Sequence, residues 1–361
     1  MIKIAMLTWP VSRLDSKCFG GLEVVEFFHL KELKKYSEVV IYGKTKTETN
    51  NIKNLERIPI LGTYDFLYYY DFVMKNQEKE IIIGYNTPLL ALFSNKKTII
   101  YFQNLLKLFG RFQVCFLPFY FLFKKRYSKM KYIFASDFLK TEFIKRYPEI
   151  PRENLYILPN FVDTAFVSKI HRRYEQNNKK KIVFAGQWNK LKGFDLLIKS
   201  VTKLRKERTD FIIYLIGGYD LWGKKENQIY IPKKNFIKKI GKLSHENTLR
   251  FFNKMDIMVI PSVWEEAFGI VAIEGMAYKL ITIASNRGGL NQLIDTKCGI
   301  KFVPDNEDNL VEALNSALNL SVKQQKKIIK NAQKKIKQKY LPKIHINQLL
   351  QIITRIKNER V

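Results

Sequence analysis

The chain has 361 residues, of which 46% are hydrophobic and 14% aromatic, with few Gly and Pro, so it can form folded cores and is neither collagen-like nor disordered. Domains commonly contain about 100 to 200 residues, and this length therefore predicts two of them. The formal net charge of +30 would attract phosphates, nucleic acid or acidic lipids, although abundant Lys with Ile, Asn, Phe and Tyr is also what A+T-rich coding produces.

The cysteines and the first apolar run bear on location. Cys18, Cys115 and Cys298 show neither metal-site nor disulfide spacing, which predicts a reducing compartment. The apolar run that follows Met1 is too short for the core of a signal peptide. We therefore expect a cytoplasmic protein.

The longest apolar stretch, Phe112–Phe123, falls short of the ~20 residues that cross a bilayer. Basic residues flank it over 107–126, as in an element that lies at the surface of an anionic membrane. A buried helix with basic ends fits the same pattern. Peripheral association with the inner face of the cytoplasmic membrane is thus one of two open interpretations.

Short β-branched and aromatic runs alternate with longer amphipathic stretches, which is typical of parallel sheets covered by helices. In the first half, strands are predicted near Ile2–Thr8, Val39–Tyr42, Ile81–Tyr85, Thr98–Phe102, Tyr132–Ala135 and Leu155–Leu158. In the second half, they are predicted near Lys181–Ala185, Phe211–Ile216, Phe236–Ile240, Ile257–Ile260, Leu280–Ala284 and Ile300–Val303. The repeated pattern predicts an α/β protein of two Rossmann-like, doubly wound domains, with ligands held at the carboxyl ends of the strands in a cleft between them.

The domain boundary is expected in Ser168–Lys180, which is almost free of apolar residues. We predict one Rossmann-like domain over 1–168 and a second over 169–339. The last segment, 340–361, has a helical pattern and is expected to return toward the first domain.

The most informative segment is Asp256–Gly289. A strand ends near Pro261, a loop carries Glu265 and Glu266, and Gly269 opens a helix that contains Glu274. A helix N-terminus offers unpaired N–H groups and a positive dipole end, which suit a diphosphate. Carboxylates beside it can bind the hydroxyl groups of a sugar and a ribose.

The motif PSVWEEAFGIVAIEGMA resembles the E-x7-E signature of glycosyltransferase family 4, with Glu266 and Glu274 as its glutamates. Other matches follow in the family order: Gly20-Gly21 after the first strand, PNFVD at Pro159–Asp163, GQWNKLKG at Gly186–Gly193, and Ile216–Gly218. The resemblance covers nearly the whole chain.

The resemblance implies a GT-B fold and a retaining hexosyltransferase (EC 2.4.1.-) that uses a nucleotide sugar and no obligatory metal. In that fold the domain over 1–168 would bind the acceptor and the domain over 169–339 would bind the nucleotide sugar. Glu266 would be catalytic and contact the donor sugar, Glu274 would bind the ribose, and Lys192 the diphosphate. The positions expected at the donor site are Gly20, Gly21, Gln187, Lys192, Glu266, Phe268, Gly269, Ile270, Val271 and Glu274. Similarity to transferases of bacterial lipopolysaccharide core and other envelope glycans favours a UDP-hexose or UDP-N-acetylhexosamine donor and a glycan or glycolipid acceptor.

The chain departs from the family at two positions. Gln187 replaces the phosphate-binding Arg, so Lys190 or Lys192 would have to supply the cation. The usual His of the first domain is replaced near Gln103-Asn104, and Gln103 cannot act as a base.

Less specific interpretations accompany these residues. Gly20-Gly21 would also suit an ordinary strand-to-helix turn, and Trp188 and Trp264 are expected to serve packing or loop structure. His29, His171 and His345 are expected on helix or linker surfaces, and His245 at the start of a helix after Ser244. The alternative function is a basic protein that binds nucleic acid or membrane without transferase activity; the charge alone favours it, and no nucleic-acid partner is predicted.

Overall fold

The computed structural model describes residues 2–8, 21–43, 49–54, 66–93, 97–104, 125–164, 167, 179–219, 229–304 and 306–359. The chain forms two compact units: unit 1 comprises Met1–Asn160 and Lys343–Val361, and unit 2 comprises Phe161–Pro342. The linker predicted over Ser168–Lys180 lies almost entirely outside the described residues and stays a prediction, as does the membrane-surface element over 107–126.

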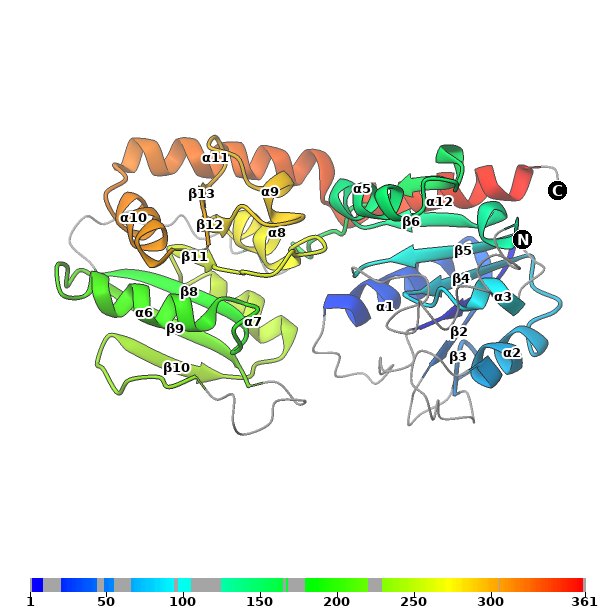
Figure 1. Cartoon of the computed structure of the whole chain (residues 1–361), viewed down its shortest axis with the longest axis horizontal. Helices are drawn as coiled ribbons and strands as arrows, with labels where there is room; N and C mark the ends of the chain where they lie inside the picture. The colour runs from blue at the N-terminus through cyan, green and yellow to red at the C-terminus, as the bar shows by residue number, and fades with distance from the viewer. Residues whose placement is uncertain are drawn as a thin grey trace. The chain divides into compact units, whose positions relative to one another are not determined.

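Unit 1 is built on a seven-stranded sheet in the order β3-β2-β1-β4-β5-β6-β7, in which all pairings are parallel (Figure 1). Its strands are β1 (Ile2–Leu7), β2 (Ser37–Gly43), β3 (Ile52–Asn54), β4 (Ile81–Tyr85), β5 (Lys97–Phe102), β6 (Lys131–Phe134) and β7 (Leu155–Ile157). Its described helices include α1 (Gly21–Leu33), α2 (Phe66–Met74), α3 (Leu90–Phe93), α5 (Asp137–Arg146) and the 3-10 helix Arg152–Asn154, with most of α12 (Pro342–Asn358). The strands are nearly continuous apolar runs because helices cover a parallel sheet on both faces.

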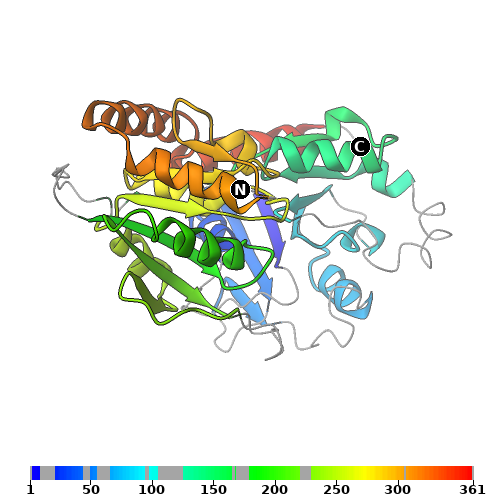
Figure 2. The same ribbon diagram turned by 60° about the vertical axis from the view of Figure 1, so that its left-hand side comes forward.

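Unit 2 holds a six-stranded parallel sheet in the order β10-β9-β8-β11-β12-β13. Its strands are β8 (Lys180–Gln187), β9 (Phe211–Gly218), β10 (Ile237–Gly241), β11 (Ile257–Ile260), β12 (Ile281–Ser285) and β13 (Ile300–Phe302). Its helices are α6 (Phe194–Leu204), α7 (His245–Phe252), α8 (Ile270–Ala277), α9 (Leu290–Leu293), α10 (Glu307–Leu318) and α11 (Val322–Lys339). Figure 2 shows α6 and α10 lying against one another, while α8 contacts α9 and α11. Two parallel-sheet α/β units confirm the predicted fold class.

Both sheets reverse their strand order at one point, between β1 and β4 in unit 1 and between β8 and β11 in unit 2. At such a switch point the loops on either side diverge and leave room for a ligand at the carboxyl edge. The fold therefore marks one candidate ligand edge in each unit.

The C-terminal helix α12 packs into the core of unit 1 through Ile346, Leu349, Ile353 and Ile356, all of which are buried. A chain of buried hydrogen bonds connects it to the sheet. The Tyr85 hydroxyl lies 2.6 Å from His29 Nδ1, His29 Nε2 lies 2.6 Å from His345 Nε2, and His345 Nδ1 donates to the Pro159 carbonyl at 2.7 Å.

The expected surface positions of His29 and His345 are therefore wrong: their exposed fractions are 0% and 1%. Their burial depends on a partner 316 residues away in the chain, which helical periodicity cannot reveal. His171 lies outside the described residues.

Candidate active site

The candidate site of unit 2 lies at the switch point, where the loops after β8 and β11 are joined. The Leu191 carbonyl accepts hydrogen bonds from the backbone N–H groups of Val263 and Trp264, both at 3.1 Å. Gly193, which has φ +65°, allows this approach, since a Cβ atom there would lie 1.7 Å from the Pro261 carbonyl oxygen. The two loops are therefore held together by contacts between their backbones.

Lys192 and Glu266 meet across these joined loops. Lys192 Nζ lies 2.6 Å from Glu266 Oε1, and the Ser262 hydroxyl donates to the same oxygen. The exposed side-chain fraction is 35% for Lys192 and 15% for Glu266, so both can reach solvent and a ligand. A cation and a hydrogen-bonded carboxylate are thus held side by side at the carboxyl edge of the sheet.

The backbone behind Glu266 is fixed by a pair of glycines after β12. Gly289 N–H donates to the Glu266 carbonyl at 2.6 Å. At Gly288, which has φ +51°, a Cβ atom would lie 2.4 Å from that same carbonyl oxygen. Beside them, Arg287 Nη1 lies 3.7 Å from Glu265 Oε1.

Helix α8 begins directly after this loop. Gly269 is its N-cap, with φ +99°, and a side chain there would collide with Leu290. The N–H groups of the first turn have no carbonyl one turn earlier in the helix, so the backbone around Ile270 and Val271 can bind an anion. Phe268 is buried, with its ring against Tyr340, and anchors the helix start.

Glu274 lies in α8 and is buried, with 6% of its side chain exposed. His245 Nε2, from the first residue of α7, lies 2.7 Å from Glu274 Oε1. Burial alone would lower the pKa of His245, but the hydrogen bond and charge of Glu274, with the charge of Asp163, outweigh burial and raise that pKa above its ordinary value. The pair therefore holds a buried carboxylate in a fixed orientation.

Sequence reasoning placed His245 correctly at the helix start, since Ser244 caps α7, but assigned it no partner. The ion pair arises from packing of α7 against α8, and no local pattern signals it. Three predicted donor-site positions remain. Gln187 ends β8, and its side-chain oxygen accepts a hydrogen bond from Asn189 at 3.0 Å. Gly21 begins α1, and Gly20 lies outside the described residues.

Of the two lysines that were expected to replace the family Arg, only one lies at Glu266. Lys190 instead lines a hollow together with Asp195, Lys199 and Glu307. Lys192 is therefore the cation best placed beside the carboxylate. Trp188 is buried and stacked on Phe194, as a packing residue would be.

A second polar cluster lies at the switch point of unit 1, after β1, β4 and β5. Thr8, Asn86, Thr87 and Gln103 are all buried. The Asn86 side chain accepts the backbone N–H of Gln103 at 2.9 Å, but its amide nitrogen and both threonine hydroxyls have no hydrogen-bond partner among the described residues. Buried polar groups are normally paired, so unpaired ones at a ligand edge favour hydroxyl or carbonyl groups of a bound molecule.

The fold of the two units is that of GT-B glycosyltransferases. Residues 167–335 match the family model described as Glycosyl transferases group 1, so most of unit 2 carries this domain. The chain resembles a glycosyltransferase of Rickettsia africae over 99% of its length and 100% of that chain, with a TM-score of 0.77 and 18% identity. It resembles Anabaena HepE in complex with UDP over 98% of its length and 100% of that chain, with a TM-score of 0.75 and 16% identity.

Among curated proteins, the lipopolysaccharide 1,2-N-acetylglucosaminetransferase of Salmonella typhimurium is 27% identical over 208 residues, which are 52% of this chain and 53% of the relative. An uncharacterized glycosyltransferase of Methanocaldococcus jannaschii is 33% identical over 138 residues, or 38% of each chain. The chain thus spans about half the length of the curated relatives it matches, or less.

Proposed function

We propose that this chain is a retaining, family 4 glycosyltransferase that moves a hexose or N-acetylhexosamine from a UDP-sugar to a glycan or glycolipid acceptor. The observation that carries the proposal is the pairing of Lys192 with Glu266 directly before the N-terminus of α8. This arrangement provides charge for a diphosphate and a carboxylate for sugar hydroxyl groups within one joined pair of loops.

In the proposed reaction, Lys192 and the first N–H groups of α8 bind the diphosphate and stabilise the charge that it gains as the bond to the anomeric carbon breaks. Glu266 orients the donor sugar, and Glu274, held by His245, binds the ribose. The acceptor oxygen bonds to the anomeric carbon on the face that the phosphate leaves. The leaving phosphate oxygen takes the acceptor proton, so no enzyme base, covalent adduct or obligatory metal is needed.

The acceptor would bind at the carboxyl edge of unit 1. Thr8, Asn86 and Thr87 are buried in this structure, and the proposal requires that the acceptor reach their uncharged hydroxyl and amide groups, which match the hydroxyl groups of a sugar. Gly84 leaves the space that the Thr87 hydroxyl occupies, since a Cβ atom would lie 2.2 Å from that oxygen. We propose an envelope glycan, such as lipopolysaccharide, as the acceptor class, and action at the inner face of the cytoplasmic membrane.

The choice of donor and product class has support from two relatives. Anabaena HepE has been crystallised with UDP-glucose, and the Salmonella relative is named for N-acetylglucosaminyl transfer in lipopolysaccharide. No described helix is long and apolar enough to cross a membrane. The rival function, a basic binding protein without transferase activity, rests on charge alone.

The test is thermal stabilisation and slow donor hydrolysis across UDP-, GDP- and ADP-sugars, with Glu266→Ala as the comparison. A ligand present at 100 times its Kd stabilises the folded state by about 2.7 kcal/mol. We expect one UDP-sugar to stabilise and to be hydrolysed by the wild type, with hydrolysis lost in the variant. A folded protein that responds to no donor would overturn the proposal, and a glycosyl adduct trapped on Glu266 would overturn the mechanism.

A further inference from the structure

The positive charge of unit 2 is concentrated on α11. This helix contains eight lysines and no Asp or Glu, whereas the whole chain has 63 basic and 33 acidic residues. The lysines are Lys323, Lys326, Lys327, Lys330, Lys334, Lys335, Lys337 and Lys339. All except Lys335 are exposed.

The other face of α11 is occupied by the unit's own core. Ile329, Ala332 and Ile336 are buried, and Gln333 donates to the carbonyls of Met276 and Ala277. Lys335 turns inward, donating to the Leu293 carbonyl and pairing with Asp295 at 3.2 Å. The orientation of the helix is therefore fixed, and its basic face is directed outward.

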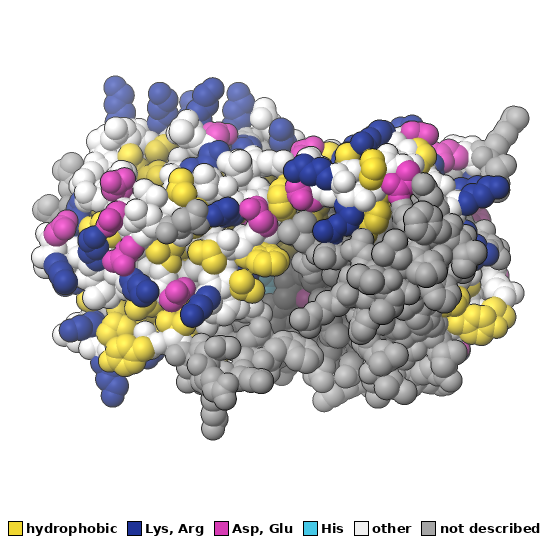
Figure 3. All heavy atoms as spheres, viewed as in Figure 1, with side chains coloured by type: hydrophobic (Ala, Val, Ile, Leu, Met, Phe, Trp, Pro, Cys, Tyr) yellow, Lys and Arg dark blue, Asp and Glu magenta, His cyan; other side chains and the backbone are white. Residues whose placement is uncertain are grey.

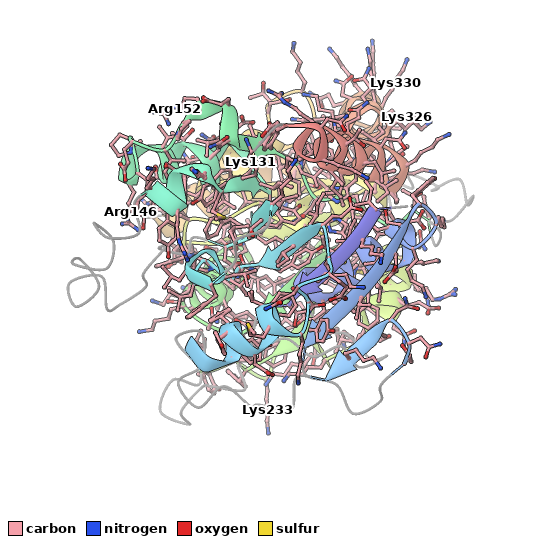
Figure 4. All side chains as sticks on the ribbon, turned by 90° about the vertical axis from the view of Figure 1, so that its right-hand side faces the viewer. Lys131, Arg146, Arg152, Lys233, Lys326 and Lys330 are labelled. Carbon is pink, nitrogen blue, oxygen red and sulfur yellow. The ribbon has the colours of Figure 1, made fainter. Side chains whose placement is uncertain are left out.

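The exposed lysines form a stripe along the helix. Lys323, Lys326, Lys330, Lys334 and Lys337 follow one another at intervals of three or four residues, which places them on one side of an α-helix over ~21 Å. Figure 3 shows Lys and Arg side chains standing in a row above α11, and Figure 4 shows Lys326 and Lys330 pointing away from the protein. Among the described residues, no ion pair involves the five lysines of this stripe.

This arrangement opposes the stability of the helix. Lys326–Lys330 and Lys330–Lys334 are like-charge pairs at i,i+4, each destabilising, and Lys323 places positive charge near the positive end of the helix dipole. The lysines on β10 differ in this respect. Lys238 and Lys239 lie on the edge strand of the sheet, where lysine prevents pairing with another chain.

We propose that the exposed face of α11 is an electrostatic docking surface for an anionic phospholipid membrane. Lysine ammonium groups are point charges on flexible stems and suit a fluid layer of phosphate headgroups. The exposed positions of α11 carry neither the aromatic rings on which bases stack nor the arginine forks that bind bases. The surface shares no residue with the site at Glu266 or with the predicted element over 107–126.

The experiment compares two variants of equal charge in the full chain. One carries Lys→Gln at 326, 330, 334 and 337 on α11. The control carries Lys→Gln at 233, 234, 238 and 239, all exposed; Figures 1 and 4 show β10 and Lys233 on the opposite side of unit 2 from α11. Gln has nearly the helix propensity of Lys, so the α11 variant should fold, and the control should fold because its four positions are exposed. Circular dichroism checks both.

Binding is measured by sedimentation with phosphatidylcholine vesicles and with vesicles in which about a third of the lipid is phosphatidylglycerol. We expect salt-sensitive binding of the wild type to the anionic vesicles alone, a loss of about 100-fold or more in the α11 variant, and a much smaller loss in the control. Equal binding by both variants would overturn the proposal, as would wild-type binding to RNA but not to anionic vesicles. Donor hydrolysis in the absence of vesicles should be the same in wild type and α11 variant, which separates failure of this surface from failure of the transferase.

Discussion

Acidification should weaken the packing of α12 against the rest of unit 1. The Pro159 carbonyl can only accept, so His345 carries its proton on Nδ1. With both rings neutral, His29 then donates from Nε2 to His345, and the Tyr85 hydroxyl donates to His29 Nδ1. The chain of hydrogen bonds runs in one direction, and a proton added to either ring reverses or breaks it and leaves a buried charge.

The expected magnitude follows from the pKa of His345. Burial lowers this pKa from 6.5 to about 4, although the Pro159 hydrogen bond opposes the shift, and burial together with the neighbouring His345 lowers the pKa of His29 well below its ordinary value. As the pH falls, the histidines of the unfolded chain bind a proton before those of the folded chain do. The contribution of the neutral histidines to the free energy of unfolding is therefore present above their ordinary pKa, and it is lost as the pH falls toward their lower pKa in the folded protein. Between pH 7 and pH 5 His345 alone should cost about 2 kcal/mol, and His29 adds to the loss.

The assay is equilibrium unfolding in urea at pH 7 and pH 5, followed by circular dichroism. The double variant His29→Gln, His345→Gln lacks both titrating rings, and His345→Gln alone serves if the double variant does not fold. Other groups titrate equally in all proteins, so the wild type should lose at least about 2 kcal/mol more than the double variant on acidification. The same loss in both would refute the reasoning.

Three further results are expected at the site in unit 2. Gly193→Ala should destabilise unit 2 by about 3 kcal/mol and lower its Tm by about 10 °C, because a Cβ atom collides with the Pro261 carbonyl at positive φ. Lys192→Ala should lower kcat of transfer by about 10²- to 10³-fold, since the leaving diphosphate loses its cation. His245→Gln should flatten the pH dependence of UDP affinity above pH 6.5, where the wild type weakens as His245 loses its proton and stops pairing with Glu274.

Each of these three predictions can be contradicted by a specific result. Lys190→Ala removes a nearby lysine that does not pair with Glu266, so an equal loss of kcat in both lysine variants would contradict the role of Lys192. For Gly193, a variant with unchanged Tm would mean that the joined loops do not contribute to stability. For His245, if UDP affinity depends on pH in the same way in the wild type and in the variant, a group other than His245 causes that dependence.

The sequence predicted those features that depend on local patterns. Apolar runs such as Ile81–Tyr85 and Ile257–Ile260 coincide with strands, because a strand buried on both faces needs a continuous apolar run. Ser244 predicted the start of α7, because a capping hydroxyl acts within one turn. The three-residue strand Ile52–Asn54 was missed, since its residues carry no alternating pattern and pair only at the edge of the sheet.

Features that join distant segments could not be predicted in this way. Glu274 is 29 positions from His245, and the buried pair His29 and His345 is separated by 316. The polar cluster at Asn86 consists of short segments that follow different strands, and only the sheet order brings them together. A resemblance can name a glutamate pair, but its hydrogen-bond partners depend on packing.

The position of α12 has a consequence for biosynthesis. Unit 1 begins with the first residues of the chain, yet part of its core comes from residues that follow the whole of unit 2. At translation rates of roughly 5 to 20 residues per second, the about 180 residues of unit 2 take roughly 10 to 40 s to synthesise. During that interval the surface that Ile346, Leu349 and Ile353 later cover is exposed on the ribosome. Of the two units, the one that is synthesised first is therefore the last to be completed.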